Sequence, residues 1–345
     1  MDISTHRSRR RLLTLAGGVT LAVLLSACGD TAPGSSQTTS SGTPSTSAAS
    51  GPWEFTDDRG KKISLPQRPT RIVMQVNAAA ALDDFGIKPT AVFGPRELES
   101  GQPDPQAGDV SPDVPSVGTE FGEFNMEKYL EQKPELLVTI MYGEALWYVP
   151  EESAAQIEEK APIVAIQLAG VPADEAIAKF GKLAESLGAD LNTPELAKAK
   201  QDFEAASASL KKAAEGKAGL KTLVVQGIAE EAYLAKPSFF SDVSYFGKLG
   251  LDLVAPTEGE APTWETISWE QVSKYPADLI LTDARDQALS QSDLAKIPTW
   301  AQLPAVRAGQ LGLWHAETPM SYQKLTPALI ELTEVVSKAR TDVVA

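Results

Sequence analysis

The 345-residue chain is poor in the side chains that most often bind metal ions or form cross-links, with one cysteine, Cys28, and two histidines. A single cysteine cannot form a disulfide within the chain. Beyond residue 27 the one histidine is His315, whereas a transition-metal site usually needs several nitrogen or sulfur ligands. A receptor for free zinc or manganese is therefore disfavoured, while a haem site with one tyrosine or histidine ligand stays open.

The sequence also lacks the motifs of common enzymes. No glycine-rich phosphate loop follows a predicted strand, and no Gly-x-Ser-x-Gly turn is present. Ser209-Leu210-Lys211-Lys212 fits the Ser-x-x-Lys pattern of penicillin-interactive enzymes, but no Lys-Thr-Gly partner accompanies it. We therefore expect a protein that is not an enzyme. The catalytic alternative is an extracellular α/β hydrolase that uses His315.

Positive charge is scarce as well. The chain has 31 Lys and Arg residues against 46 Asp and Glu residues, which gives a formal net charge of −15. The first 27 residues hold four arginines and one aspartate, so the remainder carries 27 basic and 45 acidic residues, or −18. A field of this sign repels nucleic acid and tolerates neutral or cationic solutes. We expect no nucleic-acid partner.

The N-terminus has the pattern of an export signal. Four arginines precede an apolar run, 12–25, that is too short to span a bilayer comfortably as a permanent helix. Leu25-Ser26-Ala27-Cys28 resembles a bacterial lipobox, in which the cysteine is lipidated. We predict a signal peptide over residues 1–27 and a membrane anchor on Cys28, at the cell surface or in the periplasm. A free thiol is the alternative for Cys28, and the arginines fit either a general or a twin-arginine signal.

Residues 28–52 read as a lipidated tether. Of the 24 residues from Gly29 to Pro52, 12 are Ser or Thr, and only Asp30 is charged. Such a segment cannot bury enough apolar surface to offset the entropy of ordering, so we predict disorder. As a flexible coil it reaches about 25–30 Å.

From Trp53 onward, short apolar runs alternate with helical patterns. The predicted strands are 71–76, 90–93, 136–141 and 163–167, and the predicted helices between and after them are 78–85, 126–132, 153–160 and 174–187. Before them, 53–56 and 62–65 read as a hairpin around a polar turn. Strands that alternate with helices imply parallel βα units. We predict an N-terminal α/β lobe over residues 53–192.

A long helix is predicted over residues 193–215. It begins at Thr193-Pro194, a capping residue followed by proline at the first helical position, and Leu196, Phe203 and Leu210 form one apolar stripe. The α/β pattern then resumes, which predicts a C-terminal α/β lobe over residues 216–345. The predicted fold is α/β: two lobes, each a mainly parallel sheet with flanking helices, joined by a single long helix.

The two predicted lobes share a sequence pattern. Residues 126–139 and 269–282 each carry a glutamate, then an acid eight positions later, an apolar strand and a threonine at position twelve. Internal repetition of this kind favours two related lobes that face a shared cleft.

Four segments together carry a resemblance to a known family: 55–73, 117–127, 133–137 and 300–310. Over the region from about Trp53 to the end, the chain resembles the class III substrate-binding proteins of ABC importers, which serve iron–siderophore, haem and cobalamin uptake. The resemblance implies a monomer without a cofactor of its own. Its ligand would be an Fe(III)–siderophore complex of hydroxamate type, and its partners an ABC permease with its ATPase. Cobalamin or haem is the alternative ligand.

The resemblance also implies a docking role for two glutamates. In this family a glutamate on each lobe docks onto arginines of the permease, and the matching residues here are Glu127 and Glu270. They are also the first glutamates of the internal repeat. Two carboxylates held at a fixed separation can pair with a complementary basic surface. The alternative is an ordinary solvated glutamate near a helix N-terminus.

Candidate ligand-binding residues follow the predicted strands, because ligands of such folds bind beyond the C-terminal ends of strands. Trp147 and Tyr148 come shortly after the strand that ends near Ile140. Through the resemblance, Tyr142 aligns with a tyrosine at the iron–hydroxamate centre, and Trp264, expected in a loop, aligns with a ligand-packing tryptophan. Aromatic faces suit a bulky chelate, but packing in the core is the alternative for each.

The chain departs from the hydroxamate-binding branch at one position. That branch has an arginine where this chain has Glu120 and Phe121. Arg285, which follows the strand 279–281, is a candidate for the missing donor, although pairing with Asp283 or Asp286 is the simpler interpretation. Tyr322 and Trp314 are further candidates for the cleft.

Overall fold

The computed structural model describes residues 51–98 and 100–344. The predicted signal peptide, Cys28 and the tether as far as residue 50 lie outside the described residues. In the part of the chain that is described, no helix is both long enough and apolar enough to cross a membrane.

The N-terminal lobe is built on a five-stranded sheet in the order β4-β3-β5-β6, with β7 also paired to β5. All pairs are parallel except β5 with β6. The strands are β3 (Ile72–Gln75), β4 (Ala91–Phe93), β5 (Leu136–Tyr142), β6 (Ala145–Leu146) and β7 (Ile163–Gln167). The helices are α1 (Val76–Asp84), the 3₁₀ turn η1 (Pro105–Ala107), α2 (Met126–Glu131), α3 (Glu151–Lys160) and α4 (Ala173–Ser186).

The C-terminal lobe has a six-stranded sheet in the order β11-β9-β8-β12-β13, with β10 also paired to β8. Its strands are β8 (Lys221–Gly227), β9 (Glu231–Ala235), β10 (Asp252–Leu253), β11 (Trp264–Ser268), β12 (Leu279–Asp283) and β13 (Leu311–Trp314). Its short helices are α6 (Ser241–Lys248), η2 (Val272–Lys274), α7 (Gln291–Leu294), α8 (Pro298–Ala301) and α9 (Pro304–Arg307). The predicted fold class is confirmed: two α/β lobes with mainly parallel sheets.

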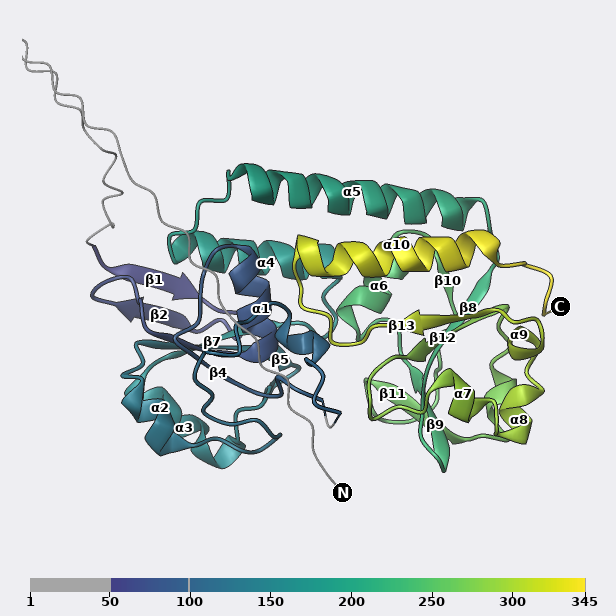
Figure 1. Ribbon diagram of the computed structural model, residues 1–345, viewed down its shortest axis with the longest axis horizontal. Coiled ribbons are helices and arrows are strands. Elements are labelled where there is room, and N and C mark those ends of the chain that lie inside the picture. The colour runs from purple at the N-terminus through teal and green to yellow at the C-terminus, as the bar shows by residue number, and fades with distance from the viewer. Residues whose placement is uncertain (1–50, 99, 345) are drawn as a thin grey trace, which may run out of the picture. The chain divides into compact units, whose positions relative to one another are not determined.

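Helix α5 (Pro194–Glu215) joins the two lobes and runs above both of them, beside α10 (Tyr322–Lys338), in Figure 1. Thr193 caps α5 by accepting a hydrogen bond from the backbone N–H of Leu196. The apolar stripe Leu196, Phe203 and Leu210 is buried, as its spacing predicts. Because α5 packs along α10, the connection between the lobes is a pair of helices with a shared core, not a bare strut.

Helix α10 contacts both lobes. At its start, the Ser321 hydroxyl donates to Asp84 of α1, and Gln323 donates to the carbonyl of the same residue. At its end, Lys217 donates to the carbonyl of Ala339. The C-terminal helix therefore ties the end of α1 in the first lobe to the end of α5 that leads into the second.

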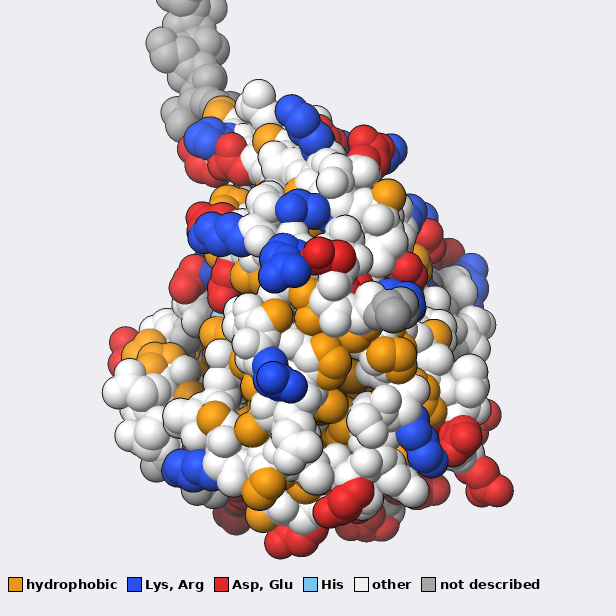
Figure 2. All heavy atoms as spheres, turned by 90° about the vertical axis from the view of Figure 1, so that its right-hand side faces the viewer, with side chains coloured by type: hydrophobic (Ala, Val, Ile, Leu, Met, Phe, Trp, Pro, Cys, Tyr) orange, Lys and Arg blue, Asp and Glu red, His pale blue; other side chains and the backbone are white. Residues whose placement is uncertain are grey.

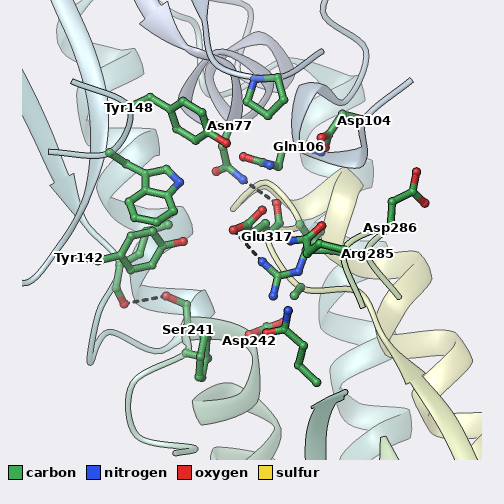
Figure 3. A pocket seen from close by; sticks show the side chains of 18 of the residues that line it. Asn77, Asp104, Gln106, Tyr142, Tyr148, Ser241, Asp242, Arg285, Asp286 and Glu317 are labelled. Carbon is green, nitrogen blue, oxygen red and sulfur yellow. Dashed lines mark hydrogen bonds and ion pairs between the residues drawn. The ribbon is translucent and has the colours of Figure 1, made fainter. Parts of the chain in front are cut away.

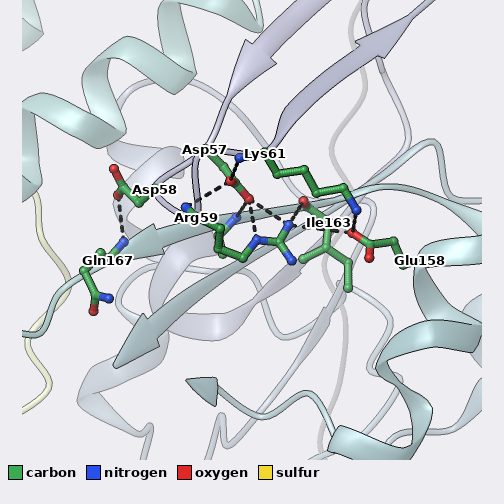
Figure 4. Close-up of polar contacts among 8 residues, drawn as sticks. Asp57, Asp58, Arg59, Lys61, Glu158, Ile163 and Gln167 are labelled. Atoms are coloured by element: carbon green, nitrogen blue, oxygen red, sulfur yellow. Dashed lines mark hydrogen bonds and ion pairs between the residues drawn. The ribbon is translucent and has the colours of Figure 1, made fainter. Parts of the chain in front are cut away.

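A small hairpin, β1 (Trp53–Thr56) and β2 (Lys62–Leu65), lies against the first lobe through its turn. Figure 4 shows the turn beside β7. The Asp57 carboxylate accepts from the backbone of Ala165, and the Asp58 carboxylate accepts from the backbone of Gln167, at 3.2 and 2.8 Å. Arg59 donates to the carbonyl of Ile163. These contacts occupy the edge of β7 that does not pair with β5.

The second lobe is less regular than its sequence suggests. Strands β9 and β11 pair antiparallel with their neighbours, and neither was among the predicted strands. Trp264 begins β11, so its predicted loop placement is wrong. Figure 2, which faces the end of this lobe, shows hydrophobic side chains at its centre with charged side chains of both signs around them.

Candidate functional site

A cavity of about 970 Å³ lies between the two lobes. Its lining residues come from both lobes, that is, from the sequence before α5 and after it. Many of them follow the C-terminal ends of parallel strands. Asn77 comes just after β3, Tyr142 ends β5, Leu168 follows β7, and Asp286 comes three residues after β12. This is the edge of an open α/β sheet at which ligands bind.

Two hydrogen bonds join the lobes at the base of this cavity. The Ser241 hydroxyl, at the start of α6, donates to the carbonyl of Leu168 at 2.8 Å, as Figure 3 shows. The backbone N–H of Gly170 donates to the carbonyl of Phe239 at 3.0 Å. These contacts hold the segment after β7 against the segment before α6, so the floor of the cavity is fixed by both lobes.

The first lobe supplies an aromatic wall. Tyr142 lies edge-on to Trp147, with ring centroids 5.0 Å apart, and Trp147 lies edge-on to Tyr148 at 5.8 Å. Phe121, which is 68% exposed, contacts the rings of both Trp147 and Tyr148. The tight turn that returns the chain from Tyr142 to Trp147 passes through Gly143, whose φ of +64° favours glycine. The wall is therefore continuous from the floor of the cavity to its rim.

The second lobe continues this aromatic surface. Phe239 stacks on Tyr142 across the lobe boundary, with centroids 5.9 Å apart and the planes 19° apart. Phe240 then packs against Phe239, Trp264 and Trp314. We use the term aromatic surface for the set Phe121, Tyr142, Trp147, Tyr148, Phe239, Phe240, Trp264 and Trp314. It offers flat faces to a bulky, partly apolar ligand.

Burial keeps the tyrosines of this surface protonated. It raises the pKa of the Tyr142 hydroxyl far above its ordinary value and raises the pKa of Tyr148 to about 12. The Tyr142 hydroxyl is directed toward the centre of the cavity in Figure 3. The indole N–H of Trp147 is buried and has no hydrogen-bond partner among the described residues. The wall thus offers neutral donors, which suit ligand oxygen atoms.

Opposite the tyrosines lies a charged cluster of Asp283, Arg285 and Glu317. The Arg285 guanidinium donates to both Asp283 carboxylate oxygens, through Nε at 3.1 and 3.0 Å and through Nη2 at 2.6 Å. Its Nη1 donates to Glu317 Oε1 at 2.9 Å. The Asp283 side chain is fully buried, and the other two are 18% exposed. One cation therefore faces two carboxylates in a largely desolvated setting.

Glu317 is held in place from the other lobe. Its backbone carbonyl accepts a hydrogen bond from Asn77 Nδ2 of α1 at 2.6 Å. Its φ is +63°, and Tyr148, also in the lining, has φ +61°. Such backbone conformations are costly for residues other than glycine and persist where the surroundings hold them. Two of them at one cavity indicate a preformed site.

Asp242 is a buried acid at the start of α6. Its carboxylate accepts from the indole Nε1 of Trp314 at 2.6 Å and from the backbone of Val243 at 2.8 Å. Burial, the largest effect, raises the pKa of Asp242 to about 6, while the bond from Trp314 and the charge of Arg285 oppose the rise. Asp242 thereby fixes the ring of Trp314 in the aromatic surface.

Six of the seven predicted ligand-binding residues line the cavity: Tyr142, Trp147, Tyr148, Trp264, Arg285 and Trp314. The structure places the seventh, Tyr322, elsewhere. Its ring lies 5.4 Å from Phe203 and 6.1 Å from Phe85, measured between centroids, and it is not part of the cavity lining. Tyr322 begins α10, and its side chain points under α5 into the shared core.

The remaining predicted positions lie outside the cavity. His315 pairs with Glu331 of α10 at 2.7 Å and does not line the cavity, so nothing here supports the hydrolase alternative. Glu127, in the first turn of α2, and Glu270, two residues after β11, are both exposed. In Figure 1, α2 and β11 lie on the side of the lobes away from α5 and α10.

Several lining residues were not predicted. They include Asn77, Asp104, Gln106, Phe239, Phe240, Asp242 and Glu317. The position of Asn77 after a buried strand could have pointed to it, as could the adjacent pair Phe239-Phe240 between a strand and a helix. Asp104 and Gln106 lie in a long loop around η1, where the sequence gives no periodic signal.

Comparisons with known proteins agree with this architecture. The sequence profile of the family described as "Periplasmic binding protein" matches residues 78–318. The chain is 38% identical to DesE, a ferric-siderophore receptor protein from Streptomyces coelicolor, with a TM-score of 0.78 over 84% of this chain and 99% of that one.

Two more distant proteins from Bacillus subtilis are also similar. The Fe(3+)-citrate-binding protein YfmC of strain 168 is 24% identical over 258 residues, which are 74% of this chain and 76% of that protein. The triscatecholate siderophore binding protein FeuA is 20% identical, with a TM-score of 0.60 over 81% of this chain and 98% of FeuA. At that identity FeuA supports the fold alone.

Proposed function

The chain belongs to the periplasmic binding protein family, and from this premise we propose that it captures a ferric siderophore, of hydroxamate type, in the cleft between its lobes and delivers it to an ABC importer. The observation that carries the proposal is the preformed cavity of about 970 Å³, which is lined by rings and by neutral hydrogen-bond donors. That volume is at the upper end for small-molecule sites, as a bulky chelate requires.

The relatives support an iron complex as the ligand. The relative at 38% identity is named as a ferric-siderophore receptor, and the one at 24% as a ferric-citrate-binding protein. The hydroxamate type rests on the aromatic surface. The Tyr142 hydroxyl points toward the centre of the cavity, where it would donate to the oxygen atoms around the iron. In this role the iron is part of the cargo.

Delivery rests on Glu127 and Glu270. Both are exposed, one in each lobe, at equivalent positions of the internal repeat. We propose that they pair with basic residues of the permease, whose ATPase drives uptake. Replacement of both by alanine should abolish uptake and leave the affinity for the ligand unchanged. A large loss of affinity would instead place them in ligand binding.

The proposed location is the outer face of the cell membrane, with Cys28 lipidated and residues 28–52 as the tether. A Cys28→Ser variant should then leave the membrane fraction. Retention of that variant in membranes would contradict the lipid anchor.

The proposal is tested by titrating the tryptophan fluorescence of the purified protein. The ligands are ferrioxamine B, ferrichrome, a ferric triscatecholate, ferric citrate, cobalamin and haem, with iron-free siderophores and free tryptophan as controls. We expect saturable quenching by a ferric hydroxamate at submicromolar concentration, and weaker quenching without iron. A response to cobalamin or haem alone would overturn the choice of ligand.

A further inference from the structure

Three carboxylates gather at one end of the cavity. They are Asp104 from the loop before η1, Asp286 after β12, and Glu317 after β13, and we refer to them as the acidic corner. Figure 3 shows Asp104, Asp286 and Glu317 around Arg285, with Tyr148 and Tyr142 across the cavity. Asp104 is 9% exposed, whereas Asp286 is open to solvent. The corner thus runs from a buried acid to an accessible one.

Basic side chains in the lining do not balance these acids. Among the described residues, the lining has six carboxylates and two arginines, and it has no lysine or histidine. Arg96 donates to the backbone carbonyls of Pro112 and Val114. Arg285 directs Nε and Nη2 to Asp283, outside the lining, and Nη1 to Glu317. Because Asp283 alone matches the charge of Arg285, the carboxylate of Glu317 adds net negative charge to the corner.

Two buried acceptors beside the corner also lack partners. Asn77 Oδ1 and Gln106 Oε1 accept no hydrogen bond from the described residues, although Asn77 is 1% exposed and Gln106 is 6% exposed. The orientation of Asn77 is fixed, because its Nδ2 donates to the carbonyl of Glu317. Figure 3 shows both amides between Tyr148 and the acidic corner. Buried polar atoms rarely stay unpaired, so these oxygens indicate a missing donor.

The pKa shifts of Asp104 and Glu317 also favour a cation at the acidic corner. Burial raises the pKa of both Asp104 and Glu317, and each is raised further by a neighbouring carboxylate, although Arg285 opposes the rise. A group that is forced toward its protonated form by burial and like charge is stabilised when a cation arrives. No group of three or more acidic, His or Cys side chains within residues 51–98 and 100–344 has the arrangement of a metal site.

We infer that the acidic corner binds a primary ammonium group of the ligand. The receptor then prefers a ferric complex with a protonated amine arm over neutral or anionic complexes with the same iron centre. An ammonium has three N–H donors, which match carboxylates and amide oxygens, and the neighbouring ring of Tyr148 adds an aromatic face. The inference rests on the proposed function, since it concerns one part of the same ligand.

The test is a charge series on one iron centre. Ferrioxamine B carries a protonated amine, its N-acetyl derivative is neutral, and its N-succinyl derivative is anionic. We expect the affinity of the protein to fall about tenfold from the amine to the acetyl form and again to the succinyl form. Added salt should weaken the binding of the amine form most.

A matched pair of variants assigns the effect to the corner. In Asp104→Asn/Asp286→Asn, the asparagine at 104 keeps the acceptor that holds the backbone of Gln106, so the fold should be unaffected. The preference for the amine form should shrink to about threefold or less. The control, Asp252→Asn, makes the same chemical change on exposed β10, outside the lining, and should keep the full preference.

The outcomes separate the inference from the proposed function. If all three complexes bind equally well, the inference is wrong while the receptor function stands. If the preference exists but survives in the double variant, the acidic corner is not its source, and the inference is also wrong. If no complex in the series binds and other ferric complexes do not bind either, the proposed function fails first.

Discussion

The cleft has two unlike regions that differ in how they are stabilised. The aromatic surface crosses both lobes through ring contacts such as Tyr142 on Phe239, and its hydrogen-bond donors are neutral. The charged cluster of Asp283, Arg285 and Glu317 belongs to the second lobe and is held by short ionic hydrogen bonds. Packing of rings is tolerant of small changes, whereas a buried ion pair is sensitive to the loss of one partner.

The difference suggests a division of work within one pocket. A surface of rings can accept many chelates of suitable size, because each ring offers a face without demanding a particular charge. Charged groups discriminate more sharply, because a ligand of the wrong sign meets unpaired charges after desolvation. We therefore expect that the aromatic surface allows the protein to accept chelates of many kinds. The charged side of the cavity should determine which of them bind tightly.

The largest effect on stability should come from removing the positive charge of Arg285. Arg285→Ala leaves the buried Asp283 carboxylate and Glu317 without a counter-charge, so we expect the free energy of unfolding to fall by about 3–5 kcal/mol. Urea unfolding measures it. Arg285→Lys, which keeps the charge but not the forked geometry, should lose less. An alanine variant as stable as the wild type would mean that the cluster is not a structural unit.

The next largest effect on stability concerns Asp242, the buried acid that bonds Trp314 of the aromatic surface. The folded pKa of Asp242, about 6, lies above that of an unfolded aspartate, about 3.9. In the folded state Asp242 therefore keeps its proton to higher pH than in the unfolded state. Its favourable contribution to the free energy of unfolding is complete below pH 4 and is lost as the pH rises to about 6.

Asp242→Asn keeps an acceptor for Trp314 and removes the titration. At pH 7 the variant should be more stable than the wild type, by up to about 3 kcal/mol, and the difference should fade toward pH 4. Unfolding curves of both proteins across this pH range measure it. A difference that does not change with pH would show that the carboxyl group does not titrate there.

A smaller effect is expected on the aromatic surface. Tyr142→Phe removes one directed hydroxyl and keeps the ring contacts with Trp147 and Phe239, so the affinity for a ferric hydroxamate should fall roughly three- to tenfold. Stability should change little. Tyr275→Phe, whose hydroxyl donates to Glu265 outside the lining, is the matched control for titration. Equal loss in both variants would argue against a specific role for Tyr142.

The smallest effect should come from the support behind Tyr142. The side chain of Gln167 accepts from the backbone N–H of Gly143 at 3.1 Å and donates to its carbonyl at 2.8 Å. Gln167→Ala frees this turn, and we expect a two- to threefold loss of affinity, mainly through faster dissociation. Stopped-flow release measures it. An unchanged release rate would leave the turn without a role in binding.

The sequence predicted the regular elements of the fold well. The helix predicted over 193–215 is α5, Pro194–Glu215, because a capping threonine, a proline and a periodic apolar stripe all agree. The strand predicted over 163–167 is β7 to the residue. Strands β9 and β11 were missed because alternation of strand and helix indicates parallel βα units, whereas β9 pairs antiparallel with both β8 and β11. Their antiparallel pairing is a tertiary feature.

The candidate site was predictable only in part. Residues directly after a strand, such as Tyr142, could be assigned to the cleft because topology fixes where strands end. Tyr322 could not be judged in this way, since the direction of a side chain at a helix start depends on what packs there. The acidic corner joins Asp104, Asp286 and Glu317, which are far apart in the sequence, and no local pattern links them.

The turn that covers the edge of β7 has a consequence for the order of folding. Asp57 and the backbone of Ala165 are separated by 108 positions, so the hairpin is synthesised well before its partner strand. Until β7 is in place, Asp57 and Asp58 lack two of their donors, the backbone N–H groups of Ala165 and Gln167. Contacts between the hairpin turn and β7 thus join segments far apart in the sequence, and until they form the edge of β7 that does not pair with β5 is open to pairing with another chain.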